Sequence, residues 1–319
     1  MTVSVVLAVV IGVLLLGAIG ALIRESRGAP PQGRAPRRVV GPDVTGRDAL
    51  EAVDLALRAL AVGCARAGRE LPDVYVLDCS ADRITLRLTR ADTDPPRPWD
   101  VDESGEEWSI SRKRPTGGED VAGQIQPFPL TVTLGLHDGS RMLVDLARAG
   151  APVALTGATA DVHRLAGAFV GELVTGPVGR GTEVTLIGSV AAELAGLSGM
   201  SSGRLHTAAT LDEALARGTD TAAIGSNRSA SVTQIYGLIE GGGSDDAEWR
   251  APRLLVVDAD RFREDMWAGG APAGLRRSDA MVVLGDVPDA AWRLAVGVDG
   301  GLDTGALGLE IDKEAGRLG

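Results

Sequence analysis

The stretch VALTGATADVHRLAG, Val153 to Gly167, decides the fold. A short apolar run leads into Gly157 and then into residues with helical spacing, which is how a phosphate-binding loop begins. Such a loop reads G-x-x-x-x-G-K-[ST], because its glycines, lysine and hydroxyl hold the phosphates and a magnesium ion. In the frame that starts at Gly157, the second glycine is Val162, the lysine is His163 and the hydroxyl is Arg164.

These replacements remove the groups that bind nucleotide. Valine lacks the backbone freedom of glycine, and Asp161 would bring a carboxylate next to the phosphates. We expect Asp161 to be the N-cap of the following helix, where its side chain accepts the free N–H groups. His163 and Arg164 are then surface residues of that helix. The segment predicts a strand-to-helix turn without the chemistry of a nucleotide site.

A second ATPase motif consists of four apolar residues followed by an acid that orders magnesium, often with a catalytic glutamate next to it. Leu254 to Val257 and Asp258 supply the first part, but Ala259 stands in the place of the glutamate. We therefore predict no catalytic residue. The positions that would be the remains of a nucleotide site are Gly157, Thr159, His163, Arg164 and Asp258.

From Ala151 onward, apolar strands alternate with helical segments. This rhythm predicts a parallel sheet covered by helices on both faces. The strand segments are PVALTG, TEVTLIG, RLHTAA, RLLVVDAD, AMVVLGD and WRLAVGVDGG, with ALGLEID as an edge.

The preceding region predicts a small α+β layer. Residues 46–71 have apolar side chains at three- and four-residue steps, which indicates an amphipathic helix that ends near Gly68. Short alternating runs between Leu71 and Ala147 predict antiparallel strands, and the Asp138-Gly139 pair predicts a two-residue hairpin. Trp99 and Trp108 are expected to pack in the core of this layer.

The N-terminal segment Val3 to Ile23 contains no charged residue and, at about 1.5 Å per residue, is long enough to cross a hydrocarbon core of about 30 Å. It predicts a transmembrane helix rather than a cleaved signal, because no basic residue precedes it. The arginines that follow predict an outside N-terminus and a cytoplasmic domain. Residues 24–43, rich in Pro, Gly and Arg, predict a linker.

The predicted fold class is therefore α/β, with a single N-terminal transmembrane helix, a small α+β layer and a P-loop-like parallel sheet covered by helices. The expected domains are the transmembrane helix 1–23, the linker 24–43, the α+β subdomain 44–147 and the degenerate P-loop-like domain 148–319.

Composition narrows the classes of ligand that we expect the chain to bind. The chain has 319 residues and a formal net charge of -11, which argues against nucleic acid as the main ligand. Cys64 and Cys79 lack metal-ligand spacing and are expected to be buried free thiols in a reducing compartment. The three histidines are far apart in sequence and none has a second ligand at helical spacing, so we expect no metal site and no cofactor.

The segment GSRMLVDLARAGAPVALTGAT resembles the entry to the motor domain of the FtsK/HerA group of P-loop ATPases. The chain is also similar to the cytoplasmic segment of actinobacterial membrane proteins that carry LysM and bacterial transcriptional activator domains, and we expect neither domain after Ile311. Five short strings match that segment in order: Ala154–Gly157, Val184–Gly188, Leu254–Val257, Ala291–Leu294 and Leu307–Leu309. The resemblance implies a P-loop fold. The replacements at Val162, His163, Arg164 and Ala259 mean that motor activity is not implied.

We therefore expect a single-pass membrane protein whose cytoplasmic, catalytically inactive domain binds a protein partner as a scaffold. One alternative is a nucleotide-binding or weak ATPase of the FtsK/HerA type, and another is a membrane-tethered regulatory protein. The sequence leaves the partner, the cellular process and the oligomeric state open.

Overall fold

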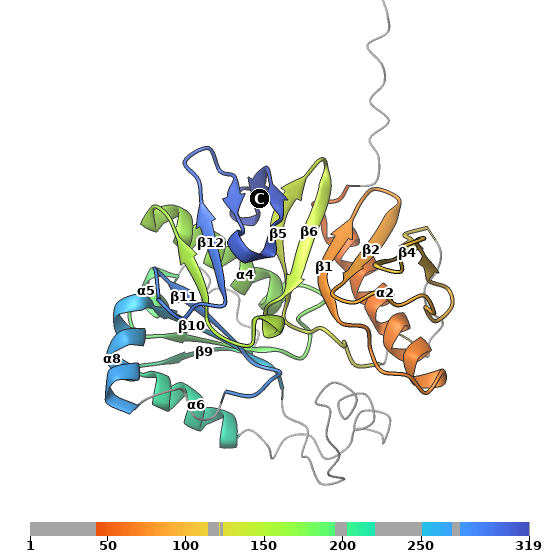
Figure 1. Cartoon of the computed structure of the whole chain (residues 1–319). Helices are drawn as coiled ribbons and strands as arrows, with labels where there is room; N and C mark the ends of the chain where they lie inside the picture. Colours follow the sequence, from red (N-terminus) through yellow and green to blue (C-terminus); the bar gives the residue numbers. More distant parts are fainter. Residues whose placement is uncertain are drawn as a thin grey trace, which may run out of the picture. The chain divides into compact units, whose positions relative to one another are not determined.

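The computed structural model describes residues 43–113, 121, 124–194, 203–220, 251–269 and 275–318. These residues form a mixed α/β fold with two sheets (Figure 1). Contacts within the chain group Pro42–Gly319 into one compact unit. The predicted division at residue 147 stays a prediction.

The prediction of a membrane-spanning helix is corrected. Across the described ranges, no helix is both long enough and apolar enough to cross a bilayer. The longest, α2 (Arg47–Arg66), is amphipathic and carries charged side chains, including Glu51 and Asp54. The predicted helix Val3 to Ile23 and linker residues 24–42 lie outside the described residues. The single-pass architecture and the cytoplasmic localisation deduced from it are therefore not carried forward.

The first sheet is antiparallel, as the alternating runs predict, and its order is β15-β5-β6-β1-β2-β4-β3. Its strands are β1 (Val74–Cys79), β2 (Arg83–Leu88), β3 (Asp100–Val101), β4 (Glu107–Ser111), β5 (Thr131–His137), β6 (Ser140–Asp145) and β15 (Lys313–Glu314). Asp138 and Gly139 have φ of 47° and 78°, so the predicted hairpin is confirmed.

Helix α2 covers one face of this sheet, and its end is close to the predicted Gly68 (Figure 1). Its apolar stripe packs with the two predicted core tryptophans, Trp99 and Trp108, which are buried. Cys64 and Cys79 are buried free thiols as expected, and burial raises the pKa of Cys64 to about 11. Neither thiol has the thiolate character that a reactive cysteine needs.

The second sheet has the order β14-β13-β12-β7-β11-β10-β8-β9, and its strands from β12 to β9 are parallel. Its strands are β7 (Val153–Thr156), β8 (Glu183–Ile187), β9 (Leu205–Ala208), β10 (Arg253–Asp258), β11 (Ala280–Leu284), β12 (Trp292–Val296), β13 (Leu302–Asp303) and β14 (Glu310–Ile311). The predicted parallel sheet and its C-terminal edge strand are confirmed.

Both faces of this sheet are covered, because alternate residues of each strand point to opposite sides. Leu254 and Val256 pack with α4 (Thr159–Thr175) and with residues of β5 and β6. Leu255 and Val257 pack with α6 (Leu211–Asp220) and α8 (Ala259–Gly269) on the other side. Helix α4 contacts strands of both sheets and so lies between them (Figure 1).

The C-terminal segment joins the two sheets. After β14 at the edge of the parallel sheet, β15 pairs with β5 of the antiparallel sheet. The short 3-10 helix η5 (Ala315–Arg317) follows and packs on α4. This return places Glu314 beside the helix that follows the predicted phosphate loop.

Candidate functional site

The candidate site is the turn between β7 and α4 at the carboxyl edge of the parallel sheet. Gly157 has a φ of +133°, and a Cβ there would lie 2.7 Å from the carbonyl oxygen of Val296. Glycine is therefore required both by the backbone angle and by the close approach of the end of β12. Carboxyl edges of parallel sheets are where α/β proteins bind ligands.

The turn is short, because only Gly157 and Ala158 separate strand from helix. The backbone N–H groups of Asp161 and Val162 donate to the carbonyl oxygen of Ala158 at 2.9 and 3.0 Å. Val162, in the place of the second loop glycine, is a buried residue of α4 packed in the core. The chain that would wrap around a phosphate is therefore already helical.

The predicted N-cap is wrong. The N-cap residue is Ala158, which gives no side-chain hydrogen bond, and Asp161 is the third residue of the helix. The chain turns earlier than predicted because Gly157 fits against Val296 and Ala158 accepts the first helical hydrogen bonds. The carboxylate of Asp161 still lies in the first turn, where the helix dipole favours negative charge. Its neighbours are the guanidinium groups of Arg164 and Arg317.

His163 and Arg164 are half-buried and paired, rather than free surface residues. The Nε2 atom of His163 lies 3.0 Å from a carboxylate oxygen of Glu193 at the end of α5 (Val190–Glu193). The Nε atom of Arg164 donates to Oε1 of Glu314 at 3.3 Å. Both residues tie α4 to neighbouring parts of the fold.

Glu314 is the buried centre of a charge network on α4. Its side chain has no exposure and lies beside Arg164 and Arg317, at 3.3 and 3.5 Å. Both arginines also face Asp161, which gives two cations and two carboxylates. A Cβ at Gly316 would come within 2.9 Å of the backbone of Arg164, so η5 lies directly against α4.

Asp258 caps a helix at the end of β10. Its Oδ1 atom accepts the N–H of Arg261 at 2.7 Å, and its Oδ2 atom accepts the hydroxyl of Ser189 at 3.2 Å. Ala259, in the place of the catalytic glutamate, is the buried first residue of α8. Asp260 lies in the first turn of α8 and pairs with Arg263 at 2.6 Å.

The structure brings four of the five predicted positions together. Gly157, Thr159, His163 and Arg164 lie in the turn and the first turns of α4, and Thr159 is exposed. Asp258 ends a strand that β11 separates from β7, and its oxygens are engaged with Ser189 and Arg261. The carboxylate of Asp258 therefore stabilises the local fold through these hydrogen bonds.

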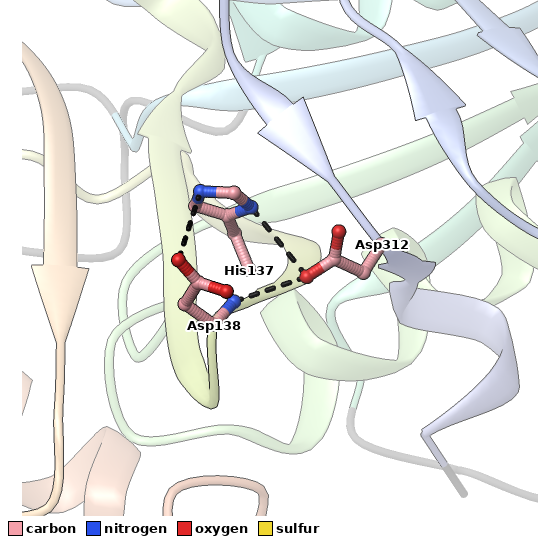
Figure 2. Close-up of side chains that lie close together, drawn as sticks. All are labelled: His137, Asp138 and Asp312. Atoms are coloured by element: carbon pink, nitrogen blue, oxygen red, sulfur yellow. Dashed lines mark hydrogen bonds and ion pairs between the residues drawn. The ribbon is translucent and has the colours of Figure 1, made fainter.

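Sequence reasoning missed a second group of polar side chains. His137 at the end of β5 lies beside Asp138 in the hairpin and Asp312 between β14 and β15 (Figure 2). The hairpin signal could have placed His137 and Asp138 at one tip. No sequence signal connects them with Asp312, because that contact depends on the return of the chain to the first sheet.

Asp145 is a buried acid at the junction of the two sheets. It caps η1 (Leu146–Ala149) by accepting the N–H of Ala147 at 3.2 Å. Burial raises its pKa to about 6, against the opposing effect of Arg148 and of that hydrogen bond. The folded pKa exceeds the unfolded value of 3.8, so the stabilising contribution is fully present below pH 3.8 and is lost as pH rises through about 6.

We predict that Asp145→Asn removes this pH dependence. Asparagine keeps the capping oxygen and carries no charge, so the variant is expected to be more stable than the parent at pH 8, by up to about 3 kcal/mol. The difference shrinks toward pH 4. Urea unfolding from pH 4 to pH 8 measures it. Asp102→Asn is the matched control, because the pKa of that exposed acid is lowered by hydrogen bonds with Ser104 and Glu107. Equal pH slopes in parent and Asp145→Asn would contradict the assignment.

Comparison with known proteins gives a limited result. No protein-family model matches the chain, and no curated protein matches its sequence. Among solved structures, the cytoplasmic domain of the type VII secretion ATPase EccC of Thermomonospora curvata is similar at 11% identity and a TM-score of 0.30. The match covers 67% of this chain, which spans 30% of the length of that structure. This is a weak similarity to the cytoplasmic domain of an ATPase, and it leaves the predicted likeness to LysM and transcriptional activator proteins untested.

Proposed function

We propose that this chain is a P-loop-like binding domain that acts through a protein partner and does not hydrolyse nucleotide. The observation that carries the proposal is the length of the turn. Only two residues lie between the end of β7 and the start of α4, so no loop remains to surround a phosphate. Hydrolysis needs positioned phosphates, a magnesium ion and an activated water. Each requirement meets a different obstacle here.

The first obstacle is the cationic position. The imidazole of His163 is engaged with Glu193, and Arg164 is engaged with Glu314 and Asp161. If Arg164 moved to a phosphate, Glu314 and Asp161 would keep only Arg317 as a cationic neighbour. For Glu314, which is fully buried, losing one of its two cations costs free energy.

The second obstacle is the magnesium position. Arg164 stands where a hydroxyl would bind the ion, and Asp258 uses both oxygens on Arg261 and Ser189. With Ala259 next to it, β10 offers no acid to activate water. The scaffold of a P-loop domain is therefore combined with side chains that stabilise the fold.

The parallel strand order supports the scaffold half of the proposal. Strand β11 lies between β7, which precedes the loop, and β10, which ends in Asp258. The carboxyl ends of β7 and β10 therefore lie at the same edge of the sheet, where α/β proteins bind ligands. The resemblance to actinobacterial LysM and transcriptional activator proteins stays a prediction, and on it we base the proposal that the partner is regulatory.

One observation favours nucleotide binding as the second candidate function. Residues Gly157 to Ala160 are exposed, and α4 has no side-chain cap, so its first N–H groups face solvent. Helix N-termini of this kind attract phosphate. The carboxylate of Asp161 in the same turn opposes an anion at that place.

We predict that MgATP and MgADP do not stabilise the full-length chain. A site with a dissociation constant of about 50 µM, saturated by about 5 mM nucleotide, would add about 2.7 kcal/mol to the free energy of unfolding. Thermal unfolding with and without nucleotide measures binding, and release of inorganic phosphate measures hydrolysis. We expect no shift in the unfolding transition and no release of phosphate.

The control variant is Asp258→Asn, because asparagine still caps α8 but is a poorer magnesium ligand. Stabilisation of the parent by MgATP that is lost in Asp258→Asn would overturn the proposal and establish the second candidate. Crosslinking of the intact chain followed by mass spectrometry then identifies the partner.

A further inference from the structure

The hairpin between β5 and β6 and the segment between β14 and β15 meet at His137, Asp138 and Asp312 (Figure 2). Backbone contacts fix the meeting point. The N–H of Asp312 donates to the carbonyl oxygen of Leu136 at 2.8 Å, and the N–H of Asp138 donates to Oδ2 of Asp312 at 3.0 Å. These hydrogen bonds hold together two parts of the chain that are 174 residues apart in sequence.

The side chains face one another at distances longer than hydrogen bonds. Nε2 of His137 is 3.7 Å from Oδ2 of Asp138, and Nδ1 is 3.5 Å from Oδ2 of Asp312. Nδ1 is buried and has no hydrogen-bond partner. Figure 2 shows the imidazole between the two carboxylates. One ligand atom from each residue lies within 4.8 Å of the others.

The three side chains are close enough to share a metal ion after side-chain rotation. Ligands at about 2.0–2.2 Å from a tetrahedral metal are about 3.3–3.6 Å apart. The carboxylates now face different nitrogens of the imidazole, Asp138 facing Nε2 and Asp312 facing Nδ1. To hold one ion, the exposed carboxylates must rotate toward the same imidazole nitrogen, and the limit of 4.8 Å between the three ligand atoms keeps this movement short. Such a set leaves a coordination position for water, as in open zinc sites.

The net charge of the cluster also favours a bound cation. Glu310 adds a third carboxylate, 3.8 Å from Nε2 of His137. Within the described residues, Asp138, Glu310 and Asp312 all form their ion pairs with this one imidazole. The carboxylates therefore carry more negative charge than the histidine neutralises, and a divalent cation would balance it.

The ligand types select the class of ion. An imidazole nitrogen with carboxylate oxygens and no sulfur suits Zn²⁺ and neighbouring divalent transition metals, whereas Ca²⁺ and Mg²⁺ prefer oxygen ligands alone. We propose that His137, Asp138 and Asp312 form a binding site for a divalent transition-metal ion such as Zn²⁺. The ion bridges the β5–β6 hairpin to the C-terminal segment. The site is independent of the proposed function, because it uses none of the residues of the turn between β7 and α4.

Zinc titration of the full-length chain, freed of metal with a chelator, tests the site. Calorimetry is expected to show one Zn²⁺ per chain and no binding of Mg²⁺ at equal concentration. His137→Gln and Asp312→Asn are expected to weaken zinc binding by about tenfold or more, because each removes a ligand. The amide side chain in Asp312→Asn keeps an oxygen for the N–H of Asp138, so this variant retains the backbone contact.

The matched control is His163→Gln, which removes another imidazole that lies beside a carboxylate, 3.0 Å from Glu193. It is expected to leave zinc affinity unchanged. Co²⁺ supplies a separate readout, since visible absorption typical of a nitrogen and oxygen site is expected in the parent and absent in His137→Gln. Failure of the parent to bind Zn²⁺ at millimolar concentration, or equal affinity in the parent and His137→Gln, would overturn the proposal.

Discussion

Asp279→Ala is expected to destabilise the chain by about 3–5 kcal/mol, which is the cost of removing one partner from a buried ion pair. Asp279 lies immediately before β11 and is 4% exposed. Its Oδ2 atom accepts a hydrogen bond from Nη2 of Arg253 at 2.8 Å, and its Oδ1 atom accepts one from Nη2 of Arg276 at 2.7 Å. The side chain of Arg253 is 6% exposed, so the variant leaves a cation buried without this carboxylate.

Urea unfolding at pH 7 measures the effect. Asp286→Ala is the control, because its pair with Arg293 at 3.2 Å is exposed to solvent and is expected to change stability by less than about 1 kcal/mol. Asp279→Asn keeps hydrogen-bond acceptors and loses the charge, so it should fall between the two. A loss below about 1 kcal/mol in Asp279→Ala would show that the pair does not stabilise the sheet.

The sequence predicts the elements whose signals are local. In β10, alternate residues such as Leu254 and Leu255 pack on opposite faces, and the almost unbroken apolar run follows from burial on both sides. The Asp138-Gly139 turn is predicted because few residue pairs tolerate two positive φ angles. The amphipathic stripe of α2 is equally local.

The start of α4 was predicted wrongly for a physical reason. A good capping residue at Asp161 marks a helix start by local preference. The actual start is set by a tertiary contact, the fit of Gly157 against Val296 from a strand far along the chain. That contact lets the backbone turn at Ala158, which overrides the preference of Asp161.

The pairing of the candidate-site side chains could not be predicted from sequence. Arg164 meets Glu314 across 150 residues, and Asp138 meets Asp312 across 174. Both contacts depend on the return of β15 to β5. A strand of two residues carries no periodic signal, so the sequence contains nothing from which this return can be inferred.

Gly135→Ala is the second change with a large expected effect, because it acts on that return. A Cβ at Gly135 would lie 2.1 Å from the carbonyl oxygen of Lys313 and 2.5 Å from Cγ2 of Ile311. Backbone atoms cannot avoid such a contact by rotation of a side chain, so β15 must move away from β5. We expect a loss of about 3 kcal/mol or more, at the upper end of the cost of overpacking.

Gly171→Ala is the matched control, since nothing lies within 4 Å of a Cβ at this position in α4. It is expected to keep or raise stability by up to about 1 kcal/mol, because alanine favours helix. Amide hydrogen exchange separates local from global effects. In Gly135→Ala, protection of the backbone amides should fall first in β15 and η5, the segment that places Glu314 beside Arg164. If both variants had the same stability and the same protection of β15, the close packing at Gly135 would not hold the C-terminal segment against α4, and the charge network around Glu314 would have to hold it alone.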